Sequence, residues 1–273
     1  MKEEIKNYLR LDERFPHILC PGCGIGTIAN ILVRTLNELN LDKNNICLVS
    51  GIGCSSRIPG YIDCDTFHTL HGRAIPCAIG VKLAKPHLKV IVIGGDGDIL
   101  AIGLSHFIHA ARRNIDLTVI IINNYNYGMT GGQVSPTTPK GKFTYTTPYS
   151  NPEEEFDIYE ISKSAGAVFF ARSTTYHIAH LKNIFKKALT KKGFSVVEIL
   201  SQCPTLYGRL NRLGDAVKML EDFKNRAVNI SHIKEPMKIP PDKIVIGVLL
   251  DREREEYCEK YEILRRMIDE KRD

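Results

Sequence analysis

Residues 90–98 read Val90-Ile91-Val92-Ile93-Gly94-Gly95-Asp96-Gly97-Asp98, an apolar run that ends in glycines and carboxylates. Four consecutive Val and Ile residues are apolar on both faces of a strand, which is typical of a buried parallel strand. Glycines after the strand allow the backbone to approach a diphosphate, and a helix that begins there presents unpaired N–H groups to it. Asp96 can then supply a hard oxygen ligand to Mg²⁺. The stretch therefore predicts a strand–turn–helix unit that binds a diphosphate with a metal ion.

The same alternation of apolar runs and helical patterns extends through most of the chain. The predicted strands are residues 46–50, 89–94, 117–123, 167–171 and 195–200, and one more apolar run covers residues 243–250. The predicted helices are residues 26–40, 72–85, 99–113, 157–165, 177–190 and the charged segment 251–273. This order predicts an α/β fold with a doubly wound, mainly parallel sheet, in which ligands lie beyond the carboxyl ends of the strands. The Gly-, Thr- and Pro-rich stretch 125–152 is too long for an ordinary connection and predicts a functional loop.

The composition is that of an ordinary globular protein. The chain has 273 residues, of which 43% are hydrophobic and 25% charged, so it can bury a substantial core. Its net charge of +6 is mild and spread along the chain, which does not indicate a nucleic-acid partner. The charged N-terminus and the lack of a long apolar run predict a cytoplasmic protein without a membrane segment. Eight cysteines without a secretory signal predict reduced thiols.

A pair of asparagines follows the diphosphate turn by about one β–α unit. Asn123 and Asn124 end the predicted strand 117–123, and adjacent parallel strands would bring them close to Asp96. A lone Gly-Asp-Gly or Asn-Asn is most often a simple turn, whereas both at this spacing point to one site. Either asparagine could face the metal.

Several cysteines fall at the same edge of the predicted sheet. Cys20 and Cys23 form a Cys-Pro-Gly-Cys turn, while Cys54 and Cys203 each follow a predicted strand. Four thiolates that converge there suit an iron–sulfur cluster or a zinc ion. Cys64 is the alternative for one of these positions.

Five motifs occur together in a fixed order. They are Cys20-Pro-Gly-Cys-Gly, Ser50-Gly-Ile-Gly-Cys-Ser-Ser, His68-Thr-Leu-His-Gly-Arg, Gly94-Gly-Asp-Gly-Asp and Gly128-Met-Thr-Gly-Gly-Gln. Over about residues 15–210 the chain resembles the β subunit of a 2-oxoacid:ferredoxin oxidoreductase, most closely the type that acts on 2-oxoglutarate. The resemblance implies a thiamine-diphosphate-binding domain over residues 1–200. Residues 201–273 would form a C-terminal extension with Cys203 and the charged terminal helix.

The resemblance also assigns site residues. The implied metal ligands are Asp96, Asn124 and Asn126 for Mg²⁺ and Cys20, Cys23, Cys54 and Cys203 for one [4Fe-4S] cluster. The implied contacts of thiamine diphosphate are Ile52, Gly53, Cys54, Ser55, His71, Gly97, Asp98, Gly128 and Met129. Asn123 remains the alternative to Asn124, and His68 the alternative to His71. No catalytic residue of this chain is identified.

The chemistry implied by the resemblance is thiamine-dependent oxidative decarboxylation of a 2-oxoacid. Coenzyme A takes the acyl group, and the cluster passes electrons to ferredoxin. In related enzymes a second subunit supplies the glutamate that activates the cofactor, so we expect an α subunit and, as further partners, small γ and δ subunits.

The choice of substrate rests on a departure from the family pattern. Some relatives carry a lysine where Gly131 stands, and that lysine meets the second carboxylate of 2-oxoglutarate. Here Arg57, Lys140 or a partner subunit must do so, and pyruvate and branched-chain 2-oxoacids remain alternative substrates. A zinc-stabilised scaffold without catalysis is the alternative from another class.

Overall fold

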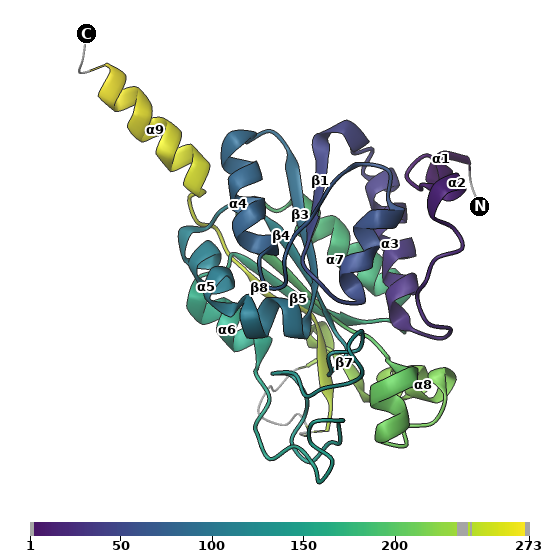
Figure 1. Cartoon of the computed structure of the whole chain (residues 1–273). Coiled ribbons are helices and arrows are strands. Elements are labelled where there is room, and N and C mark those ends of the chain that lie inside the picture. Colours follow the sequence, from purple (N-terminus) through teal and green to yellow (C-terminus); the bar gives the residue numbers. More distant parts are fainter. Residues whose placement is uncertain (1–2, 234–239, 241, 271–273) are drawn as a thin grey trace.

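The computed structural model describes residues 3–233, 240 and 242–270. Its centre is an eight-stranded sheet in the order β2-β1-β3-β4-β6-β5-β8-β7 (Figure 1). The strands are β1 (Ile46–Ser50), β2 (Asp65–His68), β3 (Lys89–Gly95), β4 (Thr118–Asn123), β5 (Phe169–Thr174), β6 (Ser195–Leu200), β7 (Ala227–Asn229) and β8 (Ile244–Asp251). Only β5 and β8 pair antiparallel; the other neighbouring strands are parallel. The predicted mainly parallel sheet is confirmed.

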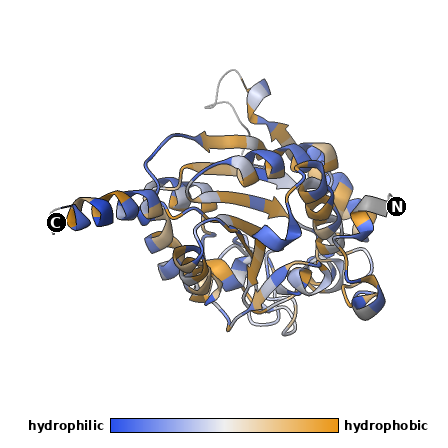
Figure 2. Ribbon diagram, turned by 90° about the horizontal axis from the view of Figure 1, so that it is seen from above, coloured by the Kyte–Doolittle hydropathy of each residue, from blue (hydrophilic) through white to orange (hydrophobic). Residues whose placement is uncertain are grey.

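Helices cover both faces of the sheet, with the apolar strands between them (Figure 2). The helices are α1 (Glu3–Lys6), α2 (Leu11–Arg14), α3 (Gly24–Glu38), α4 (Ala74–Ala84), α5 (Leu104–Arg113), α6 (Ile158–Ala165), α7 (Ile178–Thr190), α8 (Ala216–Arg226) and α9 (Tyr257–Asp269). Ile91 and Ile93 pack in the core with α3 and α7, whereas Val90 and Val92 pack in the core with α4, α5 and α6. Successive residues of a strand point to opposite faces, so a strand covered on both sides needs an unbroken apolar run.

Short helical turns carry several of the connections. They are η1 (Lys43–Asn45), η2 (Ser55–Tyr61) and η5 (Ile230–His232), of the 3₁₀ type, and η3 (Gly97–Ile102) and η4 (Pro204–Gly208), of the π type. The prediction of one helix over 99–113 is therefore wrong in its first part, because a π turn, η3, precedes α5 there. There the Gly103 N–H bonds to the Asp98 carbonyl, five residues back, at 3.1 Å. Single π turns of this kind are frequent at functional sites.

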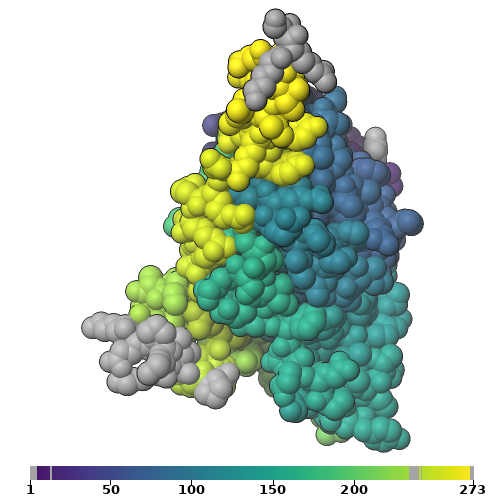
Figure 3. Space-filling model, turned by 90° about the vertical axis from the view of Figure 1, so that its left-hand side faces the viewer, coloured from purple at the N-terminus to yellow at the C-terminus, as the bar shows by residue number. Residues whose placement is uncertain are grey.

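The C-terminal region joins the sheet through β8 and then leaves the body of the molecule. Helix α9 stands away from the rest of the chain and has no buried residue among those described (Figure 3). It begins at Tyr257, so the helix predicted over 251–273 starts too early, and residues 271–273 lie outside the described part. Within the described ranges, no helix combines the length and the hydrophobicity that a membrane crossing requires.

Candidate cofactor site

The turns after β1, β3 and β4 enclose a pocket of about 180 Å³. Strand β3 lies between β1 and β4, so the carboxyl ends of the three strands meet at one edge. The pocket lining is Ile52, Gly53, Cys54, Ser55, His71, Gly95, Asp96, Gly97, Asp98, Asn124, Asn126, Tyr127, Gly128, Met129 and Thr130. It contains every residue expected to contact thiamine diphosphate and all three expected Mg²⁺ ligands. Gly95 and Thr130 also line the pocket and belong to the motifs that begin at Gly94 and Gly128, whereas Tyr127 is a lining residue outside those motifs.

Three oxygen atoms converge in this pocket. The amide oxygen of Asn124 lies 3.1 Å from Asp96 Oδ1 and 2.7 Å from the carbonyl oxygen of Asn126. Three acceptors at these distances repel one another. Turning the amide over would place its nitrogen there and make two hydrogen bonds. A bound cation relieves the repulsion equally well, because neighbouring ligands of octahedral Mg²⁺ lie about 3.0 Å apart when each bond is about 2.1 Å. The three oxygen atoms are therefore suitably placed to bind Mg²⁺.

The second oxygen of Asp96 is already occupied. Its Oδ2 accepts hydrogen bonds from Ser135 Oγ at 2.5 Å and from Thr137 Oγ1 at 2.7 Å. Burial raises the pKa of Asp96 to about 6, while these two hydrogen bonds act in the opposite direction. At neutral pH the carboxylate is ionised, with Oδ1 turned toward Asn124. Ser135 and Thr137 lie in the loop predicted to be functional, and no periodic signal marked them.

Asp98 ties two turns of the pocket together. Its Oδ1 accepts from the Ile52 N–H at 3.3 Å and from the Gly72 N–H at 2.7 Å, and Nδ1 of His71 also lies 2.7 Å away. This arrangement holds the His71 ring in the wall of the pocket. The His68 ring is bonded to a hydroxyl of β1 instead and is not part of the pocket lining in the described structure.

Three of the four expected cluster ligands lie on two loops that are bonded to each other. Cys20 and Cys23 flank a tight turn, and Gln202 Nε2 donates to the carbonyl oxygen of Gly22 inside that turn at 3.0 Å. Cys203 follows Gln202 directly. A Cβ at Gly22 would lie only 2.6 Å from Ala216 on α8, so the turn packs against the start of that helix without room for a side chain.

The four thiols act on one another electrostatically. Burial raises the pKa of Cys23 to about 12, and the thiols of Cys203, Cys54 and Cys20 add to this shift. Burial likewise raises the pKa of Cys54 to about 11. Among the described residues, no three His, Cys, Asp or Glu side chains are grouped tightly enough to hold a single metal ion. The four thiols are thus electrostatic neighbours.

The other candidates lie away from this region. Burial raises the pKa of the Cys64 thiol to about 12, and the groups that act on it electrostatically include Arg10 and the Cys47 thiol rather than the four cysteines above. Lys140 forms an ion pair with Glu154 on the surface of its loop. Neither Lys140 nor the exposed Arg57 is among the described residues that line the pocket.

Comparison with known proteins identifies the family. A family model described as "Thiamine pyrophosphate enzyme, C-terminal TPP binding domain" matches residues 51–199. The 2-oxoglutarate synthase subunit KorB of Methanothermobacter thermautotrophicus is 49% identical over 97% of this chain and 91% of the relative. The subunit KorB of Archaeoglobus fulgidus is 46% identical over 97% and 96%.

A solved structure agrees with these relatives. It is the 2-oxoglutarate:ferredoxin oxidoreductase from Magnetococcus marinus, with 2-oxoglutarate, coenzyme A and succinyl-CoA bound. The similarity has a TM-score of 0.87 and 32% identity, and it covers 97% of this chain and 90% of that chain. The present chain therefore belongs to the thiamine pyrophosphate enzymes and, within them, to the β subunits of 2-oxoacid:ferredoxin oxidoreductases, with 2-oxoglutarate synthase β subunits among its relatives.

Proposed function

We propose that this chain is the β subunit of a 2-oxoglutarate synthase that converts 2-oxoglutarate and coenzyme A into succinyl-CoA and CO₂, or runs the reverse reaction. The electrons pass to or from ferredoxin. The observation that carries the proposal is the convergence of Asp96, Asn124 and Asn126 oxygens in a pocket whose wall includes Cys54. One side of that wall suits a metal-bound diphosphate, and Cys54 belongs to the group of four thiols.

The residues of the pocket have distinct tasks. Asp96, Asn124 and Asn126 would hold Mg²⁺, and Gly97 would let the diphosphate approach the start of η3. Asp98 fixes the turns that carry Ile52 and His71. When bound, thiamine diphosphate supplies the carbanion that attacks the 2-oxoacid and the electron sink for decarboxylation. The chain itself positions this group and places a redox centre beside it.

A [4Fe-4S] cluster suits the four cysteines better than zinc. Zinc draws its thiolates to about 2.3 Å from one ion, whereas a cubane takes one thiolate at each of four separate irons. Cys54 would serve the cluster from the wall of the cofactor pocket, which shortens the path for electrons. A zinc ion with a purely structural role would not require one of its ligands to lie in the wall of the cofactor pocket. Eight free cysteines also fit a reducing compartment, and we place the protein in the cytoplasm.

The second carboxylate of 2-oxoglutarate needs a cationic partner from outside this pocket. Gly131 has no side chain, Lys140 is engaged by Glu154, and Arg57 lies outside the described lining. We therefore assign this task to the α subunit, which would also bring the glutamate that activates the cofactor. Small γ and δ subunits and ferredoxin complete the expected set of partners.

The test uses the co-expressed complex, purified without oxygen. We expect a broad absorption near the violet that dithionite bleaches, about four irons per β chain as the cluster formula requires, and coenzyme A-dependent viologen reduction that favours 2-oxoglutarate over pyruvate. Cys203→Ser should remove the absorption, whereas Cys258→Ser, in α9, should retain it. Zinc in place of iron, or equal turnover of pyruvate, would refute the proposal.

A further inference from the structure

A buried chain of polar side chains runs from the Mg²⁺-binding carboxylate into the sheet. Thr137 Oγ1 lies 2.7 Å from Asp96 Oδ2 and 2.9 Å from Asn123 Oδ1. Asn123 Nδ2 donates to Glu198 Oε1 at 3.0 Å, and Arg172 Nε donates to Glu198 Oε2 at 2.6 Å. Its members beyond Thr137 lie on β4, β6 and β5, which are neighbours in the sheet.

The series of hydrogen-bonded side chains ends, on the side away from Asp96, in a buried ion pair. Arg172 and Glu198 stand directly opposite each other on β5 and β6. Glu198 is only 3% exposed, and its ionised form would be strongly disfavoured at this depth without a cation. Arg172 supplies that cation, so Glu198 is held as a charged hydrogen-bond acceptor.

The ionised Glu198 fixes the orientation of Asn123. A carboxylate can only accept hydrogen bonds, so it must bond the nitrogen of the amide and not its oxygen. The oxygen is thereby turned toward Thr137 and also accepts from the Tyr125 N–H at 3.3 Å. Both ends of the Asn123 amide are thus fixed.

The fixed amide oxygen in turn holds Thr137. The threonine hydroxyl has one proton, which it shares between two acceptors, Asn123 Oδ1 and Asp96 Oδ2, in a three-centre hydrogen bond. Together with Ser135 it occupies Oδ2 of Asp96. Rotation of the Asp96 carboxylate would break both of these bonds, so Oδ1 stays turned toward Asn124.

These groups lie behind the metal site. Thr137, Asn123, Glu198 and Arg172 line a separate cavity of about 820 Å³, and the described lining of the cofactor pocket does not include them. Through Thr137 they reach the cofactor pocket at Asp96, one of its lining residues.

We propose that Thr137, Asn123, Glu198 and Arg172 are positioning residues that set the Asp96 carboxylate for binding of Mg²⁺ and diphosphate. The inference rests on the proposed function, because it needs Asp96 to be a metal ligand. Residues that orient metal ligands in this way influence metal affinity without touching the metal.

Thr137→Val tests the link nearest to the metal in the assembled complex. Valine keeps the shape of threonine and removes the hydroxyl. With thiamine diphosphate present and Mn²⁺ in place of Mg²⁺, free Mn²⁺ is measured by electron paramagnetic resonance. We expect the Mn²⁺ dissociation constant to rise by about 10- to 100-fold. Thr137→Ser, which keeps the hydroxyl, should recover most of the affinity.

Thr35→Val is the matched control for the loss of a buried hydroxyl. Thr35 is fully buried in α3, and its hydroxyl bonds to the Ile31 carbonyl of the same helix. This variant should lower the unfolding temperature as much as Thr137→Val does and leave the Mn²⁺ affinity unchanged. A thermal effect alone in Thr137→Val, without weaker binding of Mn²⁺, would overturn the inference.

Glu198→Gln tests the far end of the chain. If Glu198 acts through Thr137, the Glu198→Gln/Thr137→Val double variant binds Mn²⁺ no more weakly than Thr137→Val alone. If the two substitutions instead raise the Mn²⁺ dissociation constant independently, so that their fold-changes multiply, Glu198 does not act through Thr137. If the unsubstituted complex fails to bind Mn²⁺ with thiamine diphosphate, the proposed function fails instead, so the two failures are distinguishable.

Discussion

At the scale of single residues, Asp98 leaves no room for a side chain at Gly51. A Cβ at Gly51 would lie 2.2 Å from Asp98 Oδ2 and 2.4 Å from Oδ1. The same carboxylate receives the Ile52 and Gly72 N–H groups, so any movement of it releases two turns of the pocket. The glycine after β1 is therefore required by a side chain 47 positions later in the sequence.

Gly51→Ala should therefore disrupt the pocket. The methyl group displaces Asp98, and we expect binding of thiamine diphosphate to weaken by at least about tenfold, as typically follows loss of a group that orients a metal site. Calorimetric titration of the complex measures this. The control is Gly80→Ala in α4, where a Cβ meets nothing within 4 Å. This substitution should stabilise the protein by up to about 1 kcal/mol. Unchanged binding in Gly51→Ala would contradict the assigned role of Asp98.

The sequence predicted those site residues that belong to recognisable motifs. It did not predict the residues that reach the site only through the packing of distant segments. Asp96 and Asn124 directly follow strands and stand in recognisable turns. Thr137 and Glu198 do not: the first lies in a loop without periodicity, and the second is a single charge inside an apolar strand. Only pairing of β6 with β4 and β5 brings Glu198 to its partners.

At the scale of elements, buried strands were predictable and edge elements were not. All residues of β2 are exposed, so that edge strand has no apolar run to reveal it. Helix α8 buries only Met219 and Phe223. Two apolar positions are too few to produce a helical pattern in a stretch of sequence that is interrupted by prolines and glycines. The apolar run of β8 was visible, but its antiparallel pairing with β5 depends on the path of the chain and not on side-chain pattern.

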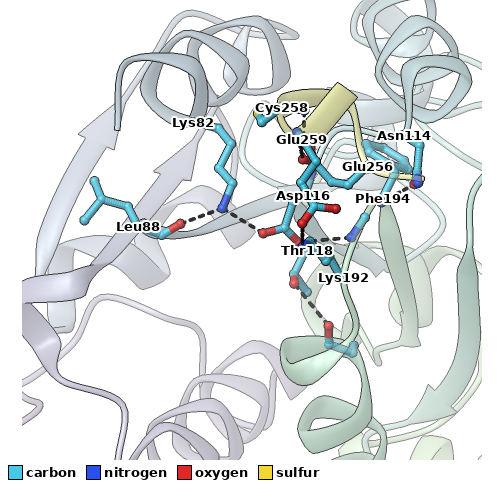
Figure 4. Close-up of polar contacts among 12 residues, drawn as sticks. Lys82, Leu88, Asn114, Asp116, Thr118, Lys192, Phe194, Glu256, Cys258 and Glu259 are labelled. Atoms are coloured by element: carbon cyan, nitrogen blue, oxygen red, sulfur yellow. Dashed lines mark hydrogen bonds and ion pairs between the residues drawn. The ribbon is translucent and has the colours of Figure 1, made fainter. Parts of the chain in front are cut away.

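Glu256 is one of several residues that join α9 to the body of the molecule, together with the Lys192–Glu259 ion pair and the hydrogen bond from the Tyr257 N–H to the Asn114 carbonyl (Figure 4). Glu256 is 3% exposed, and its Oε1 accepts from the Asp116 N–H at 3.1 Å. Its Oε2 caps the helix by accepting from Cys258 N–H at 2.7 Å and Glu259 N–H at 3.1 Å. One carboxylate thus satisfies backbone groups of two distant segments.

Glu256→Ala should lower the free energy of unfolding by about 2–4 kcal/mol, the sum of a lost helix cap and a buried N–H left without a partner. Urea denaturation measures the change. The adjacent Glu255, whose side chain is 82% exposed, provides the control, and Glu255→Ala should alter stability by less than about 0.5 kcal/mol. Equal stability of the two variants would show that Glu256 does not attach α9.

At the scale of the whole molecule, the cofactor pocket lies beside exposed apolar side chains. Ile52 and Met129 line it and are 38% and 41% exposed, and Leu70, next to His71, is 76% exposed. Exposed apolar groups gathered beside a polar site are typical of a surface that a partner covers. The α subunit expected to complete the cofactor site would cover this one.

The purified chain alone should bind thiamine diphosphate with Mg²⁺ and yet fail to oxidise 2-oxoglutarate. Within the described pocket the carboxylates are Asp96 and Asp98, both engaged, and no glutamate lines it to activate the cofactor. Loss of such a proton-transfer group alone slows a reaction by about 10²- to 10⁴-fold. Viologen reduction should therefore fall by at least about 10²-fold relative to the complex and return when the α subunit is added. Turnover by the chain alone at the rate of the complex would mean that the activating group lies within these 273 residues.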